Sequence, residues 1–112
     1  MSLDKSEILF EEALKDLNSR CYNKAVSCVY FSVRMLVEQV LEKKRLKIPR
    51  RDDKLANLVE TIGLKDVARA IRFLYTMRKK ADYSSRNISE EEAEYVFKLA
   101  EMSFKELRKL LD

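Results

Sequence analysis

Residues 22–45 read YNKAVSCVYFSVRMLVEQVLEKKR, and this stretch decides the fold. Apolar side chains recur along it at alternating spacings of four and three residues: Tyr22, Val26, Val29, Val33, Leu36 and Val40. Because an α-helix has 3.6 residues per turn, this spacing places all of them on one face. Such a face packs against another helix, so the stretch predicts a long helix inside a bundle.

The same periodicity predicts further helices before and after this one, over about 4–17, 53–61, 64–82 and 89–111. The last of them has the clearest start, because Ser89 and Glu92 have the spacing of a capping box. Asp52 or Asp53 is expected to cap the short helix, and Gly63 to end it.

The composition supports a single helical domain. The chain has 112 residues, of which 46% are hydrophobic, and this is enough for one core. It holds one glycine and one proline, which leaves little turn chemistry for a sheet of many strands. We therefore expect one all-α domain over residues 1–112, an up-and-down four-helix bundle with an additional short helix.

Histidine is absent, which excludes the nucleophile–histidine pairs of many hydrolases and zinc sites with histidine ligands. Cys21 and Cys28 cannot complete a four-sulfur site. On one helix their Cα atoms would lie about 10 Å apart, beyond disulfide reach. We expect reduced thiols, no metal or other cofactor, and a cytoplasmic protein. No apolar run is long enough for a membrane span, and the first residues lack a signal-peptide core.

Positive charge is concentrated in residues 43–54, where seven basic residues stand against two acidic ones, a net charge of +5 within a chain of net charge +4. The basic patch consists of Lys43, Lys44, Arg45, Lys47, Arg50 and Arg51. It is either a site that attracts phosphate or an acidic partner, or a solvated loop whose charges follow a helix C-terminus, where the helix dipole favours them.

The helix over 64–82 carries one charge on its apolar side. At 100° per residue most of its charged side chains fall within an arc of about 140°: Lys65, Asp66, Arg69, Arg72, Lys79 and Lys80. Arg78 instead falls in the apolar arc, and Asp82 follows it by one turn. Either Arg78 only pairs with Asp82 at the helix end, or it lines a cleft and binds phosphate bidentately. Tyr83 is then either a packed aromatic or part of that site.

The predicted helices have more apolar surface than a four-helix monomer needs. The helix over 22–45 has a small apolar patch nearly opposite its main apolar face, and the helix over 64–82 is apolar around more than half of its circumference. We therefore expect a homodimer. The candidate interface residues are Cys28, Phe31, Met35, Phe73 and Met77. Alternatively, the first helix or the short helix covers these patches within one chain.

Several stretches point to a known family. Residues 77–83 (MRKKADY), 88–94 (ISEEEAE) and 100–104 (AEMSF) are similar to an Arg-x-x-Ala-Asp-Tyr stretch, a Ser-x-Glu-Glu-Ala helix start and an Ala-Glu-x-x-Phe helix. Residues 22–26 and 30–32 agree more loosely with Tyr-x-x-Ala and Tyr-Tyr-Ala positions. With these motifs the chain resembles HEPN-domain proteins over nearly its whole length.

The resemblance implies a helical bundle, usually a homodimer, with the motif arginine near a cleft between subunits. Many such relatives are metal-independent RNase toxins in which a histidine follows the arginine after four to six residues. Others work beside a minimal nucleotidyltransferase, in the manner of a toxin–antitoxin pair. Arg78 matches the arginine, but Tyr83, Ser84 and Ser85 occupy the positions of the histidine.

Three hypotheses follow. The first is a non-catalytic binding module, a dimer that associates with a minimal nucleotidyltransferase and binds nucleotide or RNA phosphate near Arg78, Asp82 and Tyr83. The second is an RNase that uses Asp82 or Tyr83 as its base; the guanidinium of Arg78 would hold the charge of Asp82, which disfavours this role. The third is a purely structural interaction protein.

Overall fold

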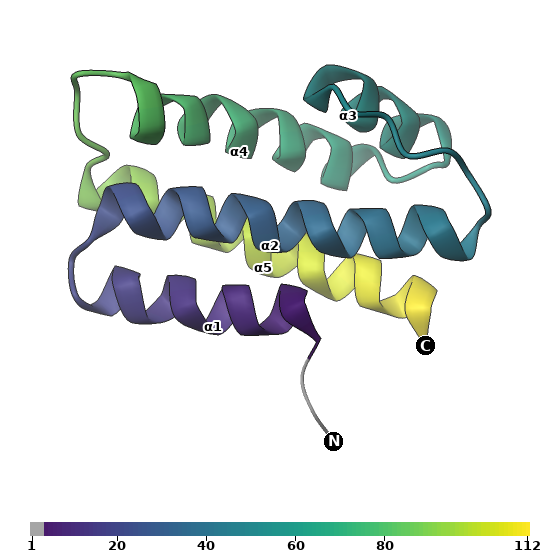
Figure 1. The fold of residues 1–112 in the computed structure, drawn as a ribbon, viewed down its shortest axis with the longest axis horizontal. Helices are drawn as coiled ribbons and strands as arrows, with labels where there is room; N and C mark the ends of the chain where they lie inside the picture. The colour runs from purple at the N-terminus through teal and green to yellow at the C-terminus, as the bar shows by residue number, and fades with distance from the viewer. Residues whose placement is uncertain (1–3) are drawn as a thin grey trace.

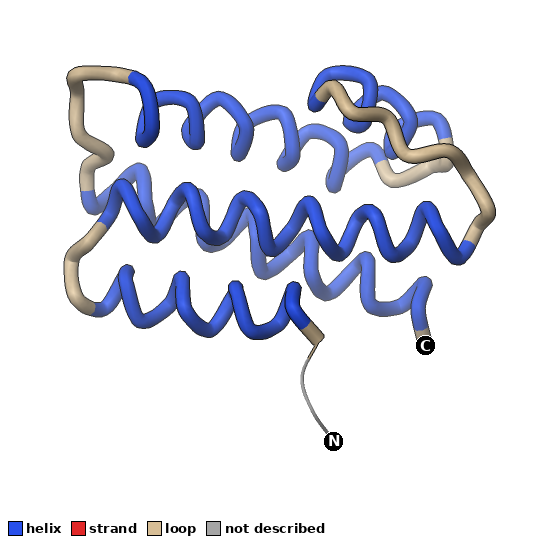
Figure 2. Tube along the Cα trace, viewed as in Figure 1, coloured by secondary structure: helices blue, strands red, loops and turns tan. Residues whose placement is uncertain are grey.

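The computed structural model describes residues 4–112 and consists of helices over this range (Figures 1 and 2). The helices are α1 (Lys5–Asn18), α2 (Tyr22–Lys43), α3 (Asp52–Thr61), α4 (Lys65–Tyr83) and α5 (Glu90–Leu111). The predicted all-α class is confirmed, with four long helices and one short one among the described residues. None of these helices combines the length and the apolar content that a membrane crossing requires.

Helix α2 lies in the middle of the molecule (Figure 1). It contacts α1, α4 and α5, while the short α3 packs on α4. Along the chain, the long helices alternate in direction, so that α1 runs opposite to α2 and α4 opposite to α5 (Figure 1). This is the expected up-and-down order.

The predicted apolar face of α2 forms the centre of the core. Five of its six members are at most 1% exposed: Val26, Val29, Val33, Leu36 and Val40. Ala13, Leu74 and Leu107 join the same cluster from α1, α4 and α5. Burial of a side chain of this size contributes roughly 1.5–3 kcal/mol to folding, so the contacts of α2 hold the bundle together.

The helix ends follow the sequence signals with one exception. Ser89 and Glu92 form the predicted capping box, and Gly63 follows α3 with a φ of +97°, a left-handed conformation that favours glycine. The prediction that Asp52 or Asp53 caps α3 is wrong. Arg51 is the N-cap, and both aspartates lie in the first turn, where the helix dipole still favours their charge.

The connection between α4 and α5 is tied to the first turn of α2. The side-chain amide of Asn23 donates to Oδ1 of Asn87 at 3.1 Å, and its oxygen accepts from the backbone N–H of Ile88 at 2.9 Å. Ile88 itself is 3% exposed. These contacts fix the C-terminal end of α4 beside α2, and that end carries the charged residues of interest.

We expect Ser89→Ala to lower the free energy of unfolding by about 1 kcal/mol, because the N–H of Glu92 loses its acceptor at the start of α5. Chemical denaturation followed by circular dichroism measures this difference. Ser85→Ala is the matched control, since Ser85 is exposed and makes no hydrogen bond to any described residue. Equal midpoints for the two variants would show that the cap does not stabilise the helix.

Candidate functional site

Arg78 extends from α4 into a group of aromatic rings. Its guanidinium carbon lies 5.0 Å from the ring centre of Phe31, 5.4 Å from that of Tyr83 and 5.9 Å from that of Tyr30. The Arg78 side chain is 20% exposed. At these distances the negative faces of the rings attract the cation, so the inward direction expected for Arg78 is confirmed.

Asp82 lies one turn further along α4 and faces the same group. Its Oδ2 is 3.0 Å from Nε of Arg78, an ion-pair distance, although this N–H does not point along the line between the two atoms. The same oxygen accepts a hydrogen bond from Oγ of Ser27 on α2 at 3.2 Å. Asp82 therefore holds Arg78 from one side and joins α4 to α2.

The far end of the Arg78 guanidinium is unengaged. Within residues 4–112, its two terminal nitrogens take part in no ion pair and no hydrogen bond. Two of the surrounding rings are accessible as well, because Tyr83 is 74% exposed and Phe31 is 40% exposed. A fork of N–H donors between exposed aromatic rings is suited to bind a phosphate and to stack a planar group beside it.

A hollow of about 450 Å³ opens beside Asp82. Polar side chains from three helices line most of it: Asp16 of α1, Asn23, Lys24, Ser27 and Cys28 of α2, and Asp82 with Ala81 of α4. The hollow shares Ser27 and Asp82 with the surroundings of Arg78. A ligand held by Arg78 therefore has polar space next to it on the α1 side.

Arg34 is a second inward cation, and the sequence reasoning did not identify it. It donates to Glu38 at 3.0 Å and to Asp52 at 2.8 Å, and also to the carbonyl oxygens of Pro49 at 3.1 Å and Arg50 at 3.3 Å. These bonds attach two segments to α2: the start of α3 and the connection that precedes it. The spacing of Arg34 from Phe31 places both on one side of α2 and is the signal that could have indicated this contact.

The basic patch is only partly free. Lys43 donates to the carbonyl oxygen of Leu111 at 3.0 Å, and Arg51 pairs with Asp53 at 2.8 Å. Four members are exposed and form no ion pair with any described residue: Lys44, Arg45, Lys47 and Arg50. All four lie in the connection between α2 and α3, which Arg34 binds through the carbonyl oxygens of Pro49 and Arg50.

The electrostatics of Asp52 link this connection to Arg78. Burial raises the pKa of the Asp52 carboxyl, and the positive charges of Arg78 and, more weakly, Lys79 act in the opposite direction. Asp52 therefore lies within electrostatic reach of Arg78. The site combines α2, α4 and the start of α3.

The expected dimer-interface residues do not form one surface. Met77 is 6% exposed and belongs to the core of the single chain, so its assignment to an interface is wrong. Phe73 packs edge-on against Tyr95 of α5, at 5.3 Å between ring centres. The periodicity of α4 marked both as apolar but did not indicate that Met77 is buried within one chain or that Phe73 packs on α5.

Helix α1 covers part of the α2 patch. The thiol of Cys28 donates to the carbonyl oxygen of Leu9 at 3.2 Å, and burial raises its pKa, with the charges of Glu12 and Asp16 adding to the effect. Phe31 and Met35 remain at the surface, exposed and half-buried respectively. The α2 part of the expected interface is thus reduced to these two side chains.

Comparison with known proteins places these observations in a family. A family model described as HEPN domain matches residues 1–110. No curated protein matches the chain.

We expect Arg34→Met to lower the free energy of unfolding by about 2–3 kcal/mol, because Asp52 is left half-buried without its partner. Arg72→Met is the matched control: its pair with Glu60 is formed by side chains that are 44% and 48% exposed, and such pairs contribute less than about 1 kcal/mol. Thermal or chemical unfolding separates the two. If Arg34→Met lowers the free energy of unfolding no more than Arg72→Met does, Arg34 does not stabilise the attachment of α3 to α2.

Proposed function

The chain belongs to the HEPN domain family, and on this premise we propose that it is a non-catalytic binding module. In this proposal it forms a homodimer, associates with a minimal nucleotidyltransferase, and holds a phosphate of a nucleotide or of RNA at Arg78. Asp82 positions Arg78, and Tyr83 and Phe31 provide the ring faces for a base. Both cysteines are free thiols, which is in keeping with work in the reducing cytoplasm.

The geometry of Arg78 carries this proposal. Asp82 and three aromatic rings hold the guanidinium in place, while its terminal nitrogens remain available. Arg34, by contrast, uses its terminal nitrogens within the chain. An arginine that is fixed before its ligand arrives loses less conformational freedom on binding, and this favours phosphate recognition.

The residue set supports binding without catalysis. The chain has no histidine to exchange a proton near pH 7. Asp82 is the nearest carboxylate, and it already pairs with Arg78 and accepts from Ser27. Both contacts are made through Oδ2 and orient the carboxylate toward Arg78 and α2. Asp82 is thus better suited to hold Arg78 than to activate a ribose hydroxyl.

The uncovered side of α2 supports the homodimer. Phe31 is an exposed aromatic on a strip of α2 beside Arg78, and half-buried Met35 follows it by one turn on the same strip. A second copy seated on this strip would bury both side chains and bring a second Arg78 close to the first. The exposed cations at positions 44–50 would border the same cleft and suit RNA or an acidic surface of the nucleotidyltransferase.

We expect Arg78→Met to weaken binding of AMP and of a short RNA by about tenfold or more, because a bidentate charged contact is lost. The free energy of unfolding should change by less than about 1 kcal/mol, since methionine packs among the same rings and Asp82 still accepts the hydrogen bond from Ser27. Isothermal titration calorimetry and thermal unfolding measure the two effects. Arg86→Met is the control, as Arg86 is exposed and forms no ion pair with any described residue. Equal affinities for both variants would remove Arg78 from the site.

The same proteins test the absence of catalysis. The unmodified chain should leave a defined RNA oligonucleotide intact after prolonged incubation. RNA cleavage that disappears in Arg78→Met and persists in Arg86→Met would show that the chain is an RNase, against our proposal.

We expect the unmodified chain to sediment as a dimer at micromolar concentration and Phe31→Glu to sediment as a monomer, because two carboxylates would face each other across the strip. Tyr95→Glu is the control: Tyr95 is also an exposed aromatic, at 51%, but lies on α5. A monomer for the unmodified chain, or a dimer that Phe31→Glu leaves intact, would contradict the proposed interface.

A further inference from the structure

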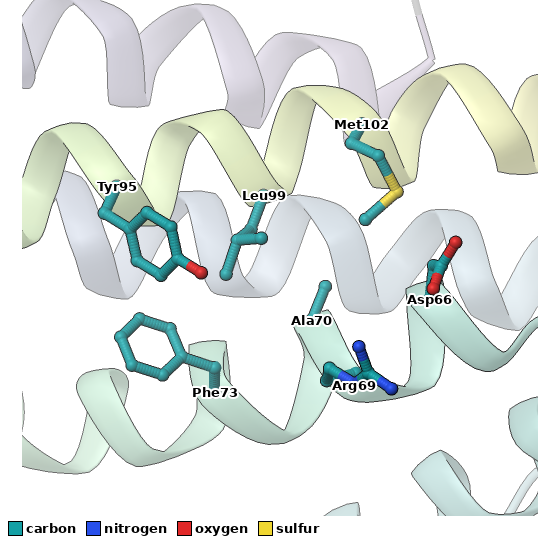
Figure 3. Close-up of a pocket in the computed structure, with 7 residues that line it drawn as sticks. All are labelled: Asp66, Arg69, Ala70, Phe73, Tyr95, Leu99 and Met102. Carbon is teal, nitrogen blue, oxygen red and sulfur yellow. The ribbon is translucent and has the colours of Figure 1, made fainter.

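A groove of about 430 Å³ runs between α4 and α5 (Figure 3). Five of its seven lining residues are apolar or aromatic: Ala70, Phe73, Tyr95, Leu99 and Met102; the other two are Asp66 and Arg69. Pockets that hold small molecules have this composition, a mostly apolar wall with a few polar groups that set the orientation. The volume lies within the usual range for such pockets.

The two ends of the groove differ in chemistry. Figure 3 shows Phe73 and Tyr95 at one end and Arg69 with Asp66 at the other. The two rings meet edge to face at 78° and close the aromatic end. The hydroxyl of Tyr95 is turned toward Leu99, along the groove (Figure 3).

The charged end is available to a ligand. Neither Arg69 nor Asp66 forms an ion pair within the part of the chain that the structure describes, and both side chains are exposed. Arginine offers a planar fork that matches a carboxylate.

The groove is separate from the Arg78 site. At 100° per residue, Phe73 lies about 140° around α4 from Arg78. The groove shares no lining residue with the hollow beside Asp82. Binding in one place therefore does not block the other.

We propose that the α4–α5 groove binds a small amphipathic organic anion, with a flat apolar body between Phe73, Leu99 and Met102 and a carboxylate at Arg69. Nothing in this assignment depends on the function proposed for Arg78. A second hollow of about 230 Å³ adjoins the groove through Asp66 and Met102.

The methionines provide a direct measurement, because each can be labelled at its methyl group and observed by NMR. Met102 lines the groove, Met35 is half-buried on α2 outside the groove, and Met77 lies in the core. We expect 1-naphthoate to shift the Met102 signal saturably in the roughly millimolar range, as suits a ligand of this size, and to leave Met35 unchanged. Arg69→Gln should weaken binding about fivefold or more. The control Lys98→Gln removes an exposed charge from α5 outside the groove and should bind as the unmodified chain does.

Leu99→Gln tests the apolar wall and should also weaken binding several-fold. If this variant does not fold by circular dichroism, Tyr95→Ala takes its place, because Tyr95 is half exposed. Three results would overturn the proposal: a Met102 signal that does not move, equal affinity of Arg69→Gln and Lys98→Gln, or binding of 1-naphthylmethylammonium as tight as that of 1-naphthoate. A Met102 signal that shifts on dilution without ligand would also overturn it, since another copy of the chain would then cover the groove.

Discussion

Helix α2 buries most of its circumference, because α1, α4 and α5 all pack against it. Three neighbours cannot surround a helix completely, and one strip of α2 is left without a helix over it. Ser27, Phe31 and Arg34 lie on this strip within an arc of about 60°. Each of them contacts a charged or polar group from α4 or from the connection to α3. The site is therefore located where the core of the bundle ends.

Two arginines border this strip, and they differ in what they leave free. Arg34 is 16% exposed and donates to four acceptors, two carboxylates and two carbonyl oxygens. Arg78 is 20% exposed, yet within residues 4–112 only its Nε has a charged partner. The two side chains are buried to a similar degree, but among these residues Arg34 is bonded through all of its nitrogens and Arg78 is held only through Nε. Among the nitrogens of Arg78, Nε is the one that is buried without a hydrogen-bond acceptor. The two terminal nitrogens reach solvent and are open to an anion, while Arg34 uses all three of its nitrogens within the chain.

The periodicity of the sequence predicted what depends on one helix at a time. It indicated the long helices, the capping box at Ser89 and the inward direction of Arg78, since these follow from spacing within about one turn. It did not predict features that need the relative placement of two helices. Met77 is an example, because whether an apolar side chain at the margin of a helix face is buried depends on the helices packed around it. The four bonds of Arg34 are another, since two of their acceptors are carbonyl oxygens of the connection, which no side-chain pattern reveals.

Helix α4 contributes side chains to three regions: the core, the Arg78 site and the groove with α5. One side packs into the core through Val67, Ile71 and Leu74. The end of that side carries Arg78, and a third side forms the groove with α5 through Ala70 and Phe73. A single rigid helix joins the two candidate binding regions, and both of its ends are fixed, by Gly63 before it and by the contacts of Asn23 after it. Coupling between the regions would require α4 to shift as a unit against α2. The close-packed side chains of the core oppose such a shift, so the two regions should bind their ligands independently.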